Sequence, residues 1–166
     1  MDRLRELHGL ADSIFGDNFG YTPLPWPLFE RACGPGYIGR ADPNASVICF
    51  DTAGDVAGLF LVYPHYGGLL AGGGVVAASE ISFAAHAADA LAAAAQPTAV
   101  MKTVGVRHDL RRRGVMDALV LEVFERGDER YDRWFGALIR ADNPSRNFAD
   151  GSHPDERRYG LYRLET

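Results

Sequence analysis

Apolar residues at helical and at alternating spacing divide the first half of the chain into helices and strands. Apolar positions three or four residues apart predict a helix over residues 2–15, and a shorter helix is expected around 28–33. Two apolar runs, 46–51 and 56–63, are separated by Thr-Ala-Gly-Asp. Because such turn residues commonly join antiparallel strands, these runs predict a β-hairpin. The stretch between the second helix and the hairpin, up to Asn44, is expected to be a loop.

The second half of the chain alternates strands with helices. Residues 67–77 hold five glycines and predict a loop, after which Ser79 and Glu80 are expected to start an alanine-rich helix over 79–95. The remaining predicted elements are a strand over 98–106, a helix over 113–126, a strand over 133–140, a short helix or turn over 143–149 and a closing strand over 159–165.

The turn between the strand 98–106 and the helix 113–126 carries the most specific chemistry in the sequence. A helix N-terminus offers unpaired backbone N–H groups and the positive end of the helix dipole to an anion. Gly114 lets the backbone approach a ligand closely. Guanidinium groups suit phosphate oxygens, and this segment carries Arg107, Arg111, Arg112 and Arg113. A solvated basic turn is the alternative, but the glycine and the flanking elements favour a phosphate site.

Composition narrows the class of protein. A chain of 166 residues with 47% hydrophobic residues can bury a core, so one domain over 1–166 is expected. The net charge of −5 argues against nucleic-acid binding, which usually needs a basic surface. Cys33 and Cys49 form no CxxC pair, and no metal site is predicted. Without a membrane-spanning run or a signal-peptide core, no membrane partner and a cytoplasmic location are expected.

From Val104 to Leu119 the chain resembles the GNAT superfamily of acyl-CoA-dependent N-acyltransferases. The family signature is Gln/Arg-x-x-Gly-x-Gly/Ala between its fourth strand and third helix. Arg111 and Gly114 match it, and Met116 stands where the family has a small residue. The element order also resembles the GNAT fold. This implies an α/β (α+β) fold with a mixed, largely antiparallel sheet flanked by helices, here without the first edge strand and with an extra helix over 79–95.

The resemblance implies transfer of an acyl group, most often acetyl, from acyl-CoA to a primary amine, with acetyl-CoA as co-substrate and no metal. In the family, the pantetheine arm of CoA pairs with the fourth strand, and the pyrophosphate lies on the following helix start. The matching positions are Val104, Gly105 and Val106 for pantetheine, and Arg111, Arg112, Arg113, Gly114, Val115 and Met116 for pyrophosphate. Asn143 matches a family asparagine, whereas Asp150 replaces the tyrosine commonly invoked as general acid.

Catalytic and acceptor residues are marked less clearly. The family often places Glu on its fourth strand to accept the amine proton, but residues 99–103 contain no acid. Glu80 is the leading candidate for the base, and it also has a structural interpretation as an acid in a helix first turn. The alternatives for the base are His65, His108 and Asp142. Acceptor contacts are expected from aromatic and histidine side chains, unless these only pack: Phe19, Tyr21, Tyr63 and His65.

Two other function classes stay open at this point. The chain could be a non-catalytic acyl-CoA-binding or sensory module that kept the phosphate site and lost the proton-transfer groups. It could also be an interaction protein whose helix 79–95 and glycine-rich loop cover a partner, and a homodimer is left open. The expected acceptor is a small-molecule or peptide amine, because nothing in the sequence singles out one substrate.

Overall fold

One four-stranded sheet organises the protein. The computed structural model describes residues 2–16, 18, 20–70, 80–136 and 157–160. The strands are β1 (Val47–Phe50), β2 (Val56–Pro64), β3 (Thr98–Val106) and β4 (Arg133–Gly136), and they lie in the order β1-β2-β3-β4. The first two pairs are antiparallel and β3 pairs with β4 in parallel. The expected mixed, largely antiparallel sheet is therefore confirmed, and no described residue before β1 lies in a strand.

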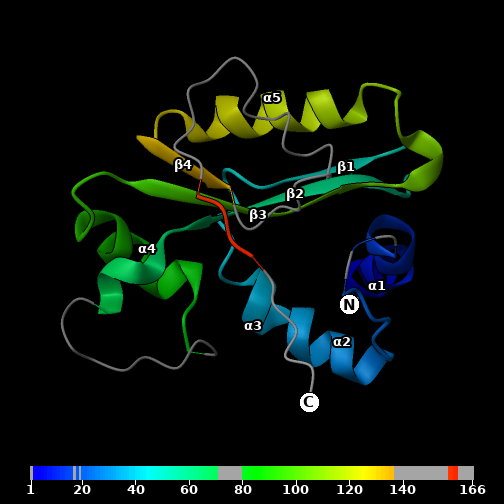
Figure 1. Cartoon of the computed structure of the whole chain (residues 1–166), viewed down its shortest axis with the longest axis horizontal. Coiled ribbons are helices and arrows are strands. Elements are labelled where there is room, and N and C mark those ends of the chain that lie inside the picture. Colours follow the sequence, from blue (N-terminus) through cyan, green and yellow to red (C-terminus); the bar gives the residue numbers. More distant parts are fainter. Residues whose placement is uncertain (1, 17, 19, 71–79, 137–156, 161–166) are drawn as a thin grey trace.

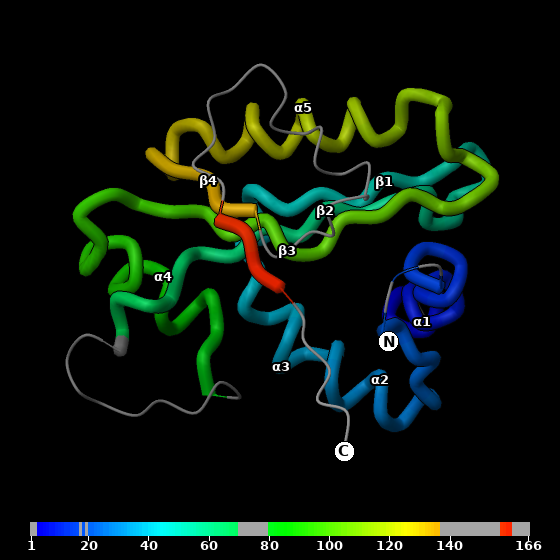
Figure 2. Tube along the Cα trace, viewed as in Figure 1, coloured from blue at the N-terminus to red at the C-terminus, as the bar shows by residue number. Residues whose placement is uncertain are grey.

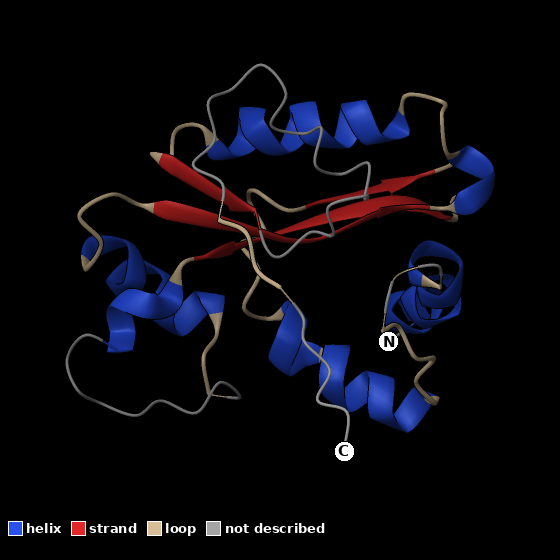
Figure 3. Ribbon diagram, in the orientation of Figure 1, coloured by secondary structure: helices blue, strands red, loops and turns tan. Residues whose placement is uncertain are grey.

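Helices cover both faces of this sheet (Figures 1 and 3). Helix α5 (Val115–Gly127) lies on one face, above the sheet in the figures. The other face carries α1 (Asp2–Phe15), α2 (Trp26–Cys33), α3 (Pro35–Ile38) and α4 (Phe83–Ala92). Figure 2 shows that α1 and α4 stand at opposite ends of this second layer, with α3 between them.

Strand β2 supplies side chains to both layers because alternate residues of a strand point to opposite faces. All nine of its residues are buried, as expected for a central strand covered on both sides. Phe60 and Val62 join the core beneath α5. Leu59, Leu61 and Tyr63 join a second core formed with α1 and the segment after α3.

Helix α1 is held closely against β3. A Cβ atom on Gly105 would collide with the side chain of Ile14, so glycine allows the helix to approach the strand. The Arg111 guanidinium donates to the carbonyl oxygens of Ser13 (3.2 Å) and Ile14 (3.1 Å), at the C-terminal end of α1. A cation at this end of a helix also complements the helix dipole. The turn before α5 is therefore fixed relative to α1.

A buried carboxylate joins two segments that lie far apart in the sequence. Asp42 is fully buried and accepts hydrogen bonds from the Tyr131 hydroxyl (2.7 Å), Arg130 Nε (3.0 Å) and the backbone N–H of Asn44 (2.8 Å). Burial raises the pKa of Tyr131, and its hydrogen bond to Asp42 adds to the rise. Because three donors satisfy it, the carboxylate ties the segment before β1 to the segment before β4.

Several predicted boundaries differ from the structure. The alanine-rich helix begins at Phe83 rather than 79, because Ser82 is its N-cap and accepts a hydrogen bond from the Ala85 N–H (3.3 Å). Ser79 lies outside the described residues, and Glu80 lies in the turn before the helix. Helix α3 occupies part of the stretch expected to be a loop up to Asn44.

The glycine-rich segment and the C-terminal elements are described only in part. A 3₁₀ helix over Tyr66–Leu70 replaces the start of the expected loop, and residues 71–77 are not described. Only 133–136 of the strand predicted over 133–140 are described, and these form β4. The short helix over 143–149 lies outside the described residues. Residues 159–160 of the expected closing strand are not in a strand, and 161–165 are not described.

Candidate functional site

The turn before α5 presents a row of backbone N–H groups. The N–H groups of residues 112–117 donate to no described residue, whereas Arg111 N–H donates to His108 O and Ala118 N–H to Gly114 O. Arg112 and Gly114 both have left-handed backbone conformations, with φ of 62° and 77°. Left-handed residues within a turn aim successive N–H groups into one concavity, which binds anions. This row of N–H groups begins at Arg112, one residue after the start of the expected phosphate cradle, which stays a prediction.

The four arginines of this segment have different surroundings. Arg107 forms ion pairs with Asp51 (2.8 Å) and Asp109 (2.7 Å), and it lowers the pKa of both carboxyl groups. The guanidinium of Arg111 donates hydrogen bonds to carbonyl oxygens at the C-terminal end of α1. Arg112 and Arg113 are exposed and form no hydrogen bond or ion pair with a described residue. The charge available to an anion therefore comes from Arg112 and Arg113.

Val115 and Met116 direct their side chains away from the cradle. Both are partly buried and pack against the core cluster beneath α5. The Met116 side chain therefore packs toward the core, while its N–H has no partner among the described residues.

Strand β3 is paired on both sides along only part of its described length. Strand β4 pairs with it from Thr98↔Arg133 to Met101↔Gly136. Beyond this point, toward Val104, Gly105 and Val106, no described strand pairs with β3 on that side, whereas β2 continues on the other side. Among the described residues, this edge of β3 therefore has no strand partner, and such an edge can pair with an extended ligand.

A β-bulge lies where the two-sided pairing ends. Leu61 pairs with Thr103 and Val62 pairs with Met101, so Lys102 is an extra residue on β3. Bulges redirect a side chain and bend the strand, and they are frequent beside active sites. Lys102, the only lysine in the chain, points from this bulge into a pocket.

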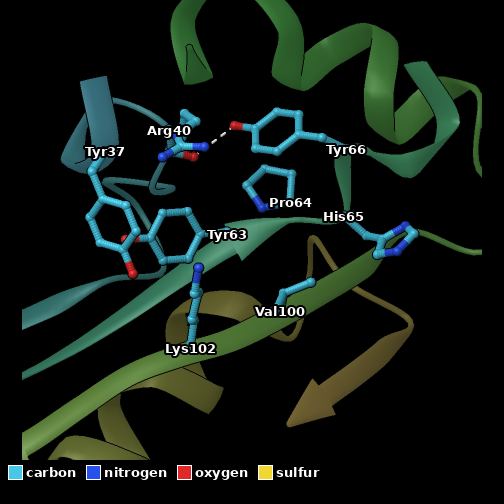
Figure 4. Close-up of a pocket in the computed structure, with 8 residues that line it drawn as sticks. All are labelled: Tyr37, Arg40, Tyr63, Pro64, His65, Tyr66, Val100 and Lys102. Atoms are coloured by element: carbon cyan, nitrogen blue, oxygen red, sulfur yellow. Dashed lines mark hydrogen bonds between the residues drawn. The ribbon is translucent and has the colours of Figure 1, made fainter. Parts of the chain in front are cut away.

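The pocket has a volume of about 210 Å³ and lies where the ends of β2 and β3 approach α3 (Figure 4). Its lining residues are Tyr37, Arg40, Tyr63, Pro64, His65, Tyr66, Val100 and Lys102. The sequence had indicated Tyr63 and His65. It missed Tyr37 and Arg40, which lie in the stretch expected to be a loop.

Polar groups inside the pocket lack partners. Tyr63 is 7% exposed, and neither its hydroxyl nor Arg40 Nε, both buried atoms, finds a hydrogen-bond partner among the described residues. The Tyr66 hydroxyl donates to Arg40 O (2.7 Å), and the Tyr37 hydroxyl lies 2.9 Å from Thr103 Oγ1. Burial raises the pKa of Tyr63, and it raises the pKa of Tyr66 to about 12. The Tyr63 and Tyr66 hydroxyls are therefore neutral near pH 7.

The pocket is positively charged. Arg40 Cζ and Lys102 Nζ lie 5.3 Å and 5.2 Å from the centre of the Tyr37 ring, so both cations are held near the same aromatic side chain. None of the lining residues is acidic, and neither cation forms an ion pair within the described part of the chain.

The other candidate residues lie outside this pocket. Glu80 is exposed and does not line it, although the Phe83 N–H donates to Gly39 O (2.8 Å) and brings the start of α4 next to Arg40. Tyr21 donates to Asp12 on α1 (2.6 Å). His108 is exposed in the 3₁₀ turn after β3. Phe19, Asp142 and Asn143 fall outside the described residues.

The described residues contain neither a candidate metal site nor a candidate membrane-spanning helix. No group of three or more His, Cys, Asp or Glu side chains lies in an arrangement that could hold a metal ion there. Of the described helices, none is long and apolar enough to span a membrane. The cytoplasmic location stays a prediction.

Comparison with solved structures relates this architecture to acetyltransferases. A probable acetyltransferase matches with a TM-score of 0.59 at 13% identity, over 100% of this chain and 93% of that one. An aminoglycoside N-acetyltransferase in complex with CoA matches with a TM-score of 0.57 at 16% identity, over 99% and 90%. A ribosomal-protein-alanine N-acetyltransferase from Brucella melitensis biovar Abortus 2308 gives 0.56 at 13%, over 98% and 94%.

In sequence, no protein-family model and no curated protein matches the chain. At such low identity, the structural matches establish the fold and not the activity. The chain has the GNAT acetyltransferase fold.

Proposed function

We propose that this protein transfers an acetyl group from acetyl-CoA to the primary amine of a small-molecule or peptide acceptor. The observation that carries the proposal is the arrangement along β3. A row of N–H groups without a partner among the described residues follows the end of the strand. The strand edge that leads back from it is paired with no described strand, and a pocket opens at the Lys102 bulge. From the bulge to Val106 the strand spans roughly 13 Å, which suits an extended ligand arm.

Each part of CoA has a place in this proposal. The pyrophosphate binds the N–H groups that begin at Arg112, with Arg112 and Arg113 supplying charge. The pantetheine arm pairs with the free edge of β3 beside Val104, Gly105 and Val106. The thioester then lies at the bulge, next to the pocket that receives the amine. Asn143 stays a proposed contact.

The reaction requires the neutral amine to attack the thioester carbonyl carbon. The new C–N bond forms, the C–S bond breaks, CoA leaves as a thiolate, and the amine nitrogen loses a proton. Two cations beside the amine, Arg40 and Lys102, disfavour its protonated form and help keep it reactive. Because its pKa is raised, Tyr63 is suited to donate a hydrogen bond to an oxygen atom rather than to give up its proton.

For the proton acceptor we retain Glu80. It lies in the turn before α4, and the start of that helix is hydrogen-bonded next to Arg40. A Glu80→Gln variant should lose on the order of 10²-fold in kcat, the usual scale of general-base catalysis. Glu129→Gln changes an exposed carboxylate elsewhere and is the matched control. If both variants turn over at the rate of the parent, Glu80 is not the base.

A second candidate function is a non-catalytic acyl-CoA-binding module. It is favoured by the pocket lining, which contains no acidic residue among the described residues. Thiol release from acetyl-CoA with a panel of primary amines separates the two functions, with CoA binding measured by calorimetry in parallel. Release that depends on the amine supports the enzyme. Tight CoA binding without release for any amine supports the binding module. A homodimer stays a prediction.

A further inference from the structure

We propose that the acceptor carries a carboxylate close to its amine, and that Arg40 and Lys102 bind this carboxylate. The inference rests on the proposed function of the pocket and names the class of its substrate. Amino acids with an apolar or aromatic side chain are the simplest members of this class.

The first argument is the unpaired guanidinium of Arg40. The protein pairs its other partly buried arginines with carboxylates: Arg130 with Asp42 and Arg107 with Asp51. Arg40 has no such partner among the described residues, and its Nε is buried without an acceptor. A buried charged donor without an acceptor lowers the stability of the fold. A ligand anion that accepts a hydrogen bond from Arg40 would remove this free-energy cost.

The second argument is the convergence of different donors on one space. Arg40 comes from the segment after α3, Tyr63 from β2 and Lys102 from the β3 bulge, and all three line the pocket (Figure 4). The Tyr63 hydroxyl is buried and has no hydrogen-bond partner among the described residues, and it is a neutral donor. Guanidinium, ammonium and phenol groups together match the two oxygens of a carboxylate.

The third argument is the size and character of the pocket. The pocket volume of about 210 Å³ corresponds to the volume that roughly seven water molecules occupy in the liquid. It lies below the range of pockets that bind drug-sized ligands, which starts at ~300 Å³. Three tyrosine rings and Val100 supply an apolar surface. A polycationic acceptor would meet Arg40 and Lys102 as like charges, which disfavours it. The pocket therefore suits a small acceptor with one anionic group.

A binding experiment without acetyl-CoA tests this inference directly. The probes are phenylacetate and its neutral isostere phenylacetamide, compared by calorimetry on the unmodified protein. We expect phenylacetate to bind at least about tenfold more tightly, since a hydrogen bond to a charged group contributes more than a neutral one. Equal affinity of the two probes overturns the inference.

The single lysine provides a second readout. Reductive ¹³C-methylation labels only Lys102 and the chain N-terminus, and it keeps their charge. Phenylacetate should shift the Lys102 methyl signal and raise the pKa of the labelled amine, because a nearby carboxylate favours the charged form. An unchanged Lys102 signal at saturating phenylacetate overturns the inference.

Variants then assign the contact to its residues. Arg40→Gln and Lys102→Gln should each weaken phenylacetate binding by about tenfold or more. Arg5→Gln is the matched control, because Arg5 also lies over an aromatic ring, that of Trp26, but outside the pocket. Melting temperatures report whether the variants remain folded. Equal affinity in the control and both pocket variants refutes the assignment.

A turnover comparison connects the carboxylate site to the reaction. Phenylalanine should be acetylated with a kcat/KM at least about tenfold above that of phenethylamine, which lacks the carboxylate. A preference for phenethylamine overturns the inference. If phenylacetate does not bind, only the inference of a carboxylate site is refuted. If no amine causes thiol release, only the proposed acetyl transfer is refuted.

Discussion

Replacing Gly114 with alanine tests whether the turn before α5 binds CoA. Gly114 has a φ of +77°, and a Cβ atom placed on it meets no protein atom within 4 Å. The substitution therefore causes no clash within the protein, but it strains the backbone by about 1–2 kcal/mol. The new methyl group also lies in the turn where the pyrophosphate is proposed to bind.

The expected loss of affinity follows from the hydrogen bonds that the methyl group disrupts. Two charge-assisted bonds at about 1.5 kcal/mol each amount to about 3 kcal/mol, or about 100-fold in Kd. At a CoA concentration of about 100 times the parent Kd, CoA stabilises the parent by about 2.7 kcal/mol and the variant by about 0.4 kcal/mol. For a chain of this size the corresponding rise in Tm is roughly 5–11 °C for the parent and roughly 1–2 °C for the variant.

Thermal-shift measurements with and without CoA provide the assay, and Gly54→Ala is the matched control. Gly54 lies in the turn between β1 and β2 with a φ of +86° and also has no atom near the added Cβ. Both variants should lose similar intrinsic stability, but only Gly114→Ala should lose the stabilisation by CoA. If CoA raises the Tm of both variants equally, the cradle is not the CoA site.

Three further predictions concern charge and stability. CoA binding should weaken as NaCl rises from about 0.05 to about 0.5 M. Arg113→Ala should reduce the binding free energy of CoA by roughly 1–3 kcal/mol, whereas the control Arg31→Ala on α2 should not change it. Calorimetry measures both effects, and a salt-independent Kd contradicts the role of the arginines. Asp42→Ala should lower the free energy of unfolding by about 3–5 kcal/mol, because it leaves the partly buried Arg130 unpaired. Urea denaturation measures this loss, with the exposed Asp55→Ala as the control. A similar denaturation midpoint for both variants argues against the prediction. The folded protein holds Tyr66 protonated up to about pH 12, whereas the unfolded chain ionises it near pH 10. The stability of the fold should therefore fall as the pH rises above about 10. A Tm that is unchanged between about pH 9 and about pH 11 would contradict this prediction.

The sequence predicted the elements whose periodicity is long and uninterrupted. The strand over 98–106 matches β3 residue for residue, and the helix over 113–126 differs from α5 by only one or two residues at its ends. Gly114 in the turn before α5 has a positive φ, which glycine adopts readily, whereas the phosphate site itself stays a prediction. The partners of individual arginines were not predictable, since the ion pair of Arg107 with Asp51 and the contact of Arg111 with α1 depend on segments far away in the chain.

For the same reason, the sequence indicated only some of the residues that line the pocket beside Lys102. Tyr63 lies in the clearly predicted strand β2, and His65 follows it. Tyr37, however, lies in α3 and Arg40 shortly after it, and this four-residue helix has a Pro-Gly sequence that does not predict a helix. The β-bulge at Lys102 leaves no local signal, because it results from the register between two strands. The alanine-rich helix was placed three or four residues too early, since Ser79 and Ser82 are both acceptable N-caps by sequence.

The contacts of Asp42 have a consequence for the order of folding. Its partners Arg130 and Tyr131 lie 88 and 89 residues further along the chain. Strands β1, β2 and β3 pair with their neighbours in sequence and can associate before those residues leave the ribosome. The carboxylate of Asp42 must then stay hydrated until the chain reaches position 131, so its burial belongs to the late, long-range steps that slow folding.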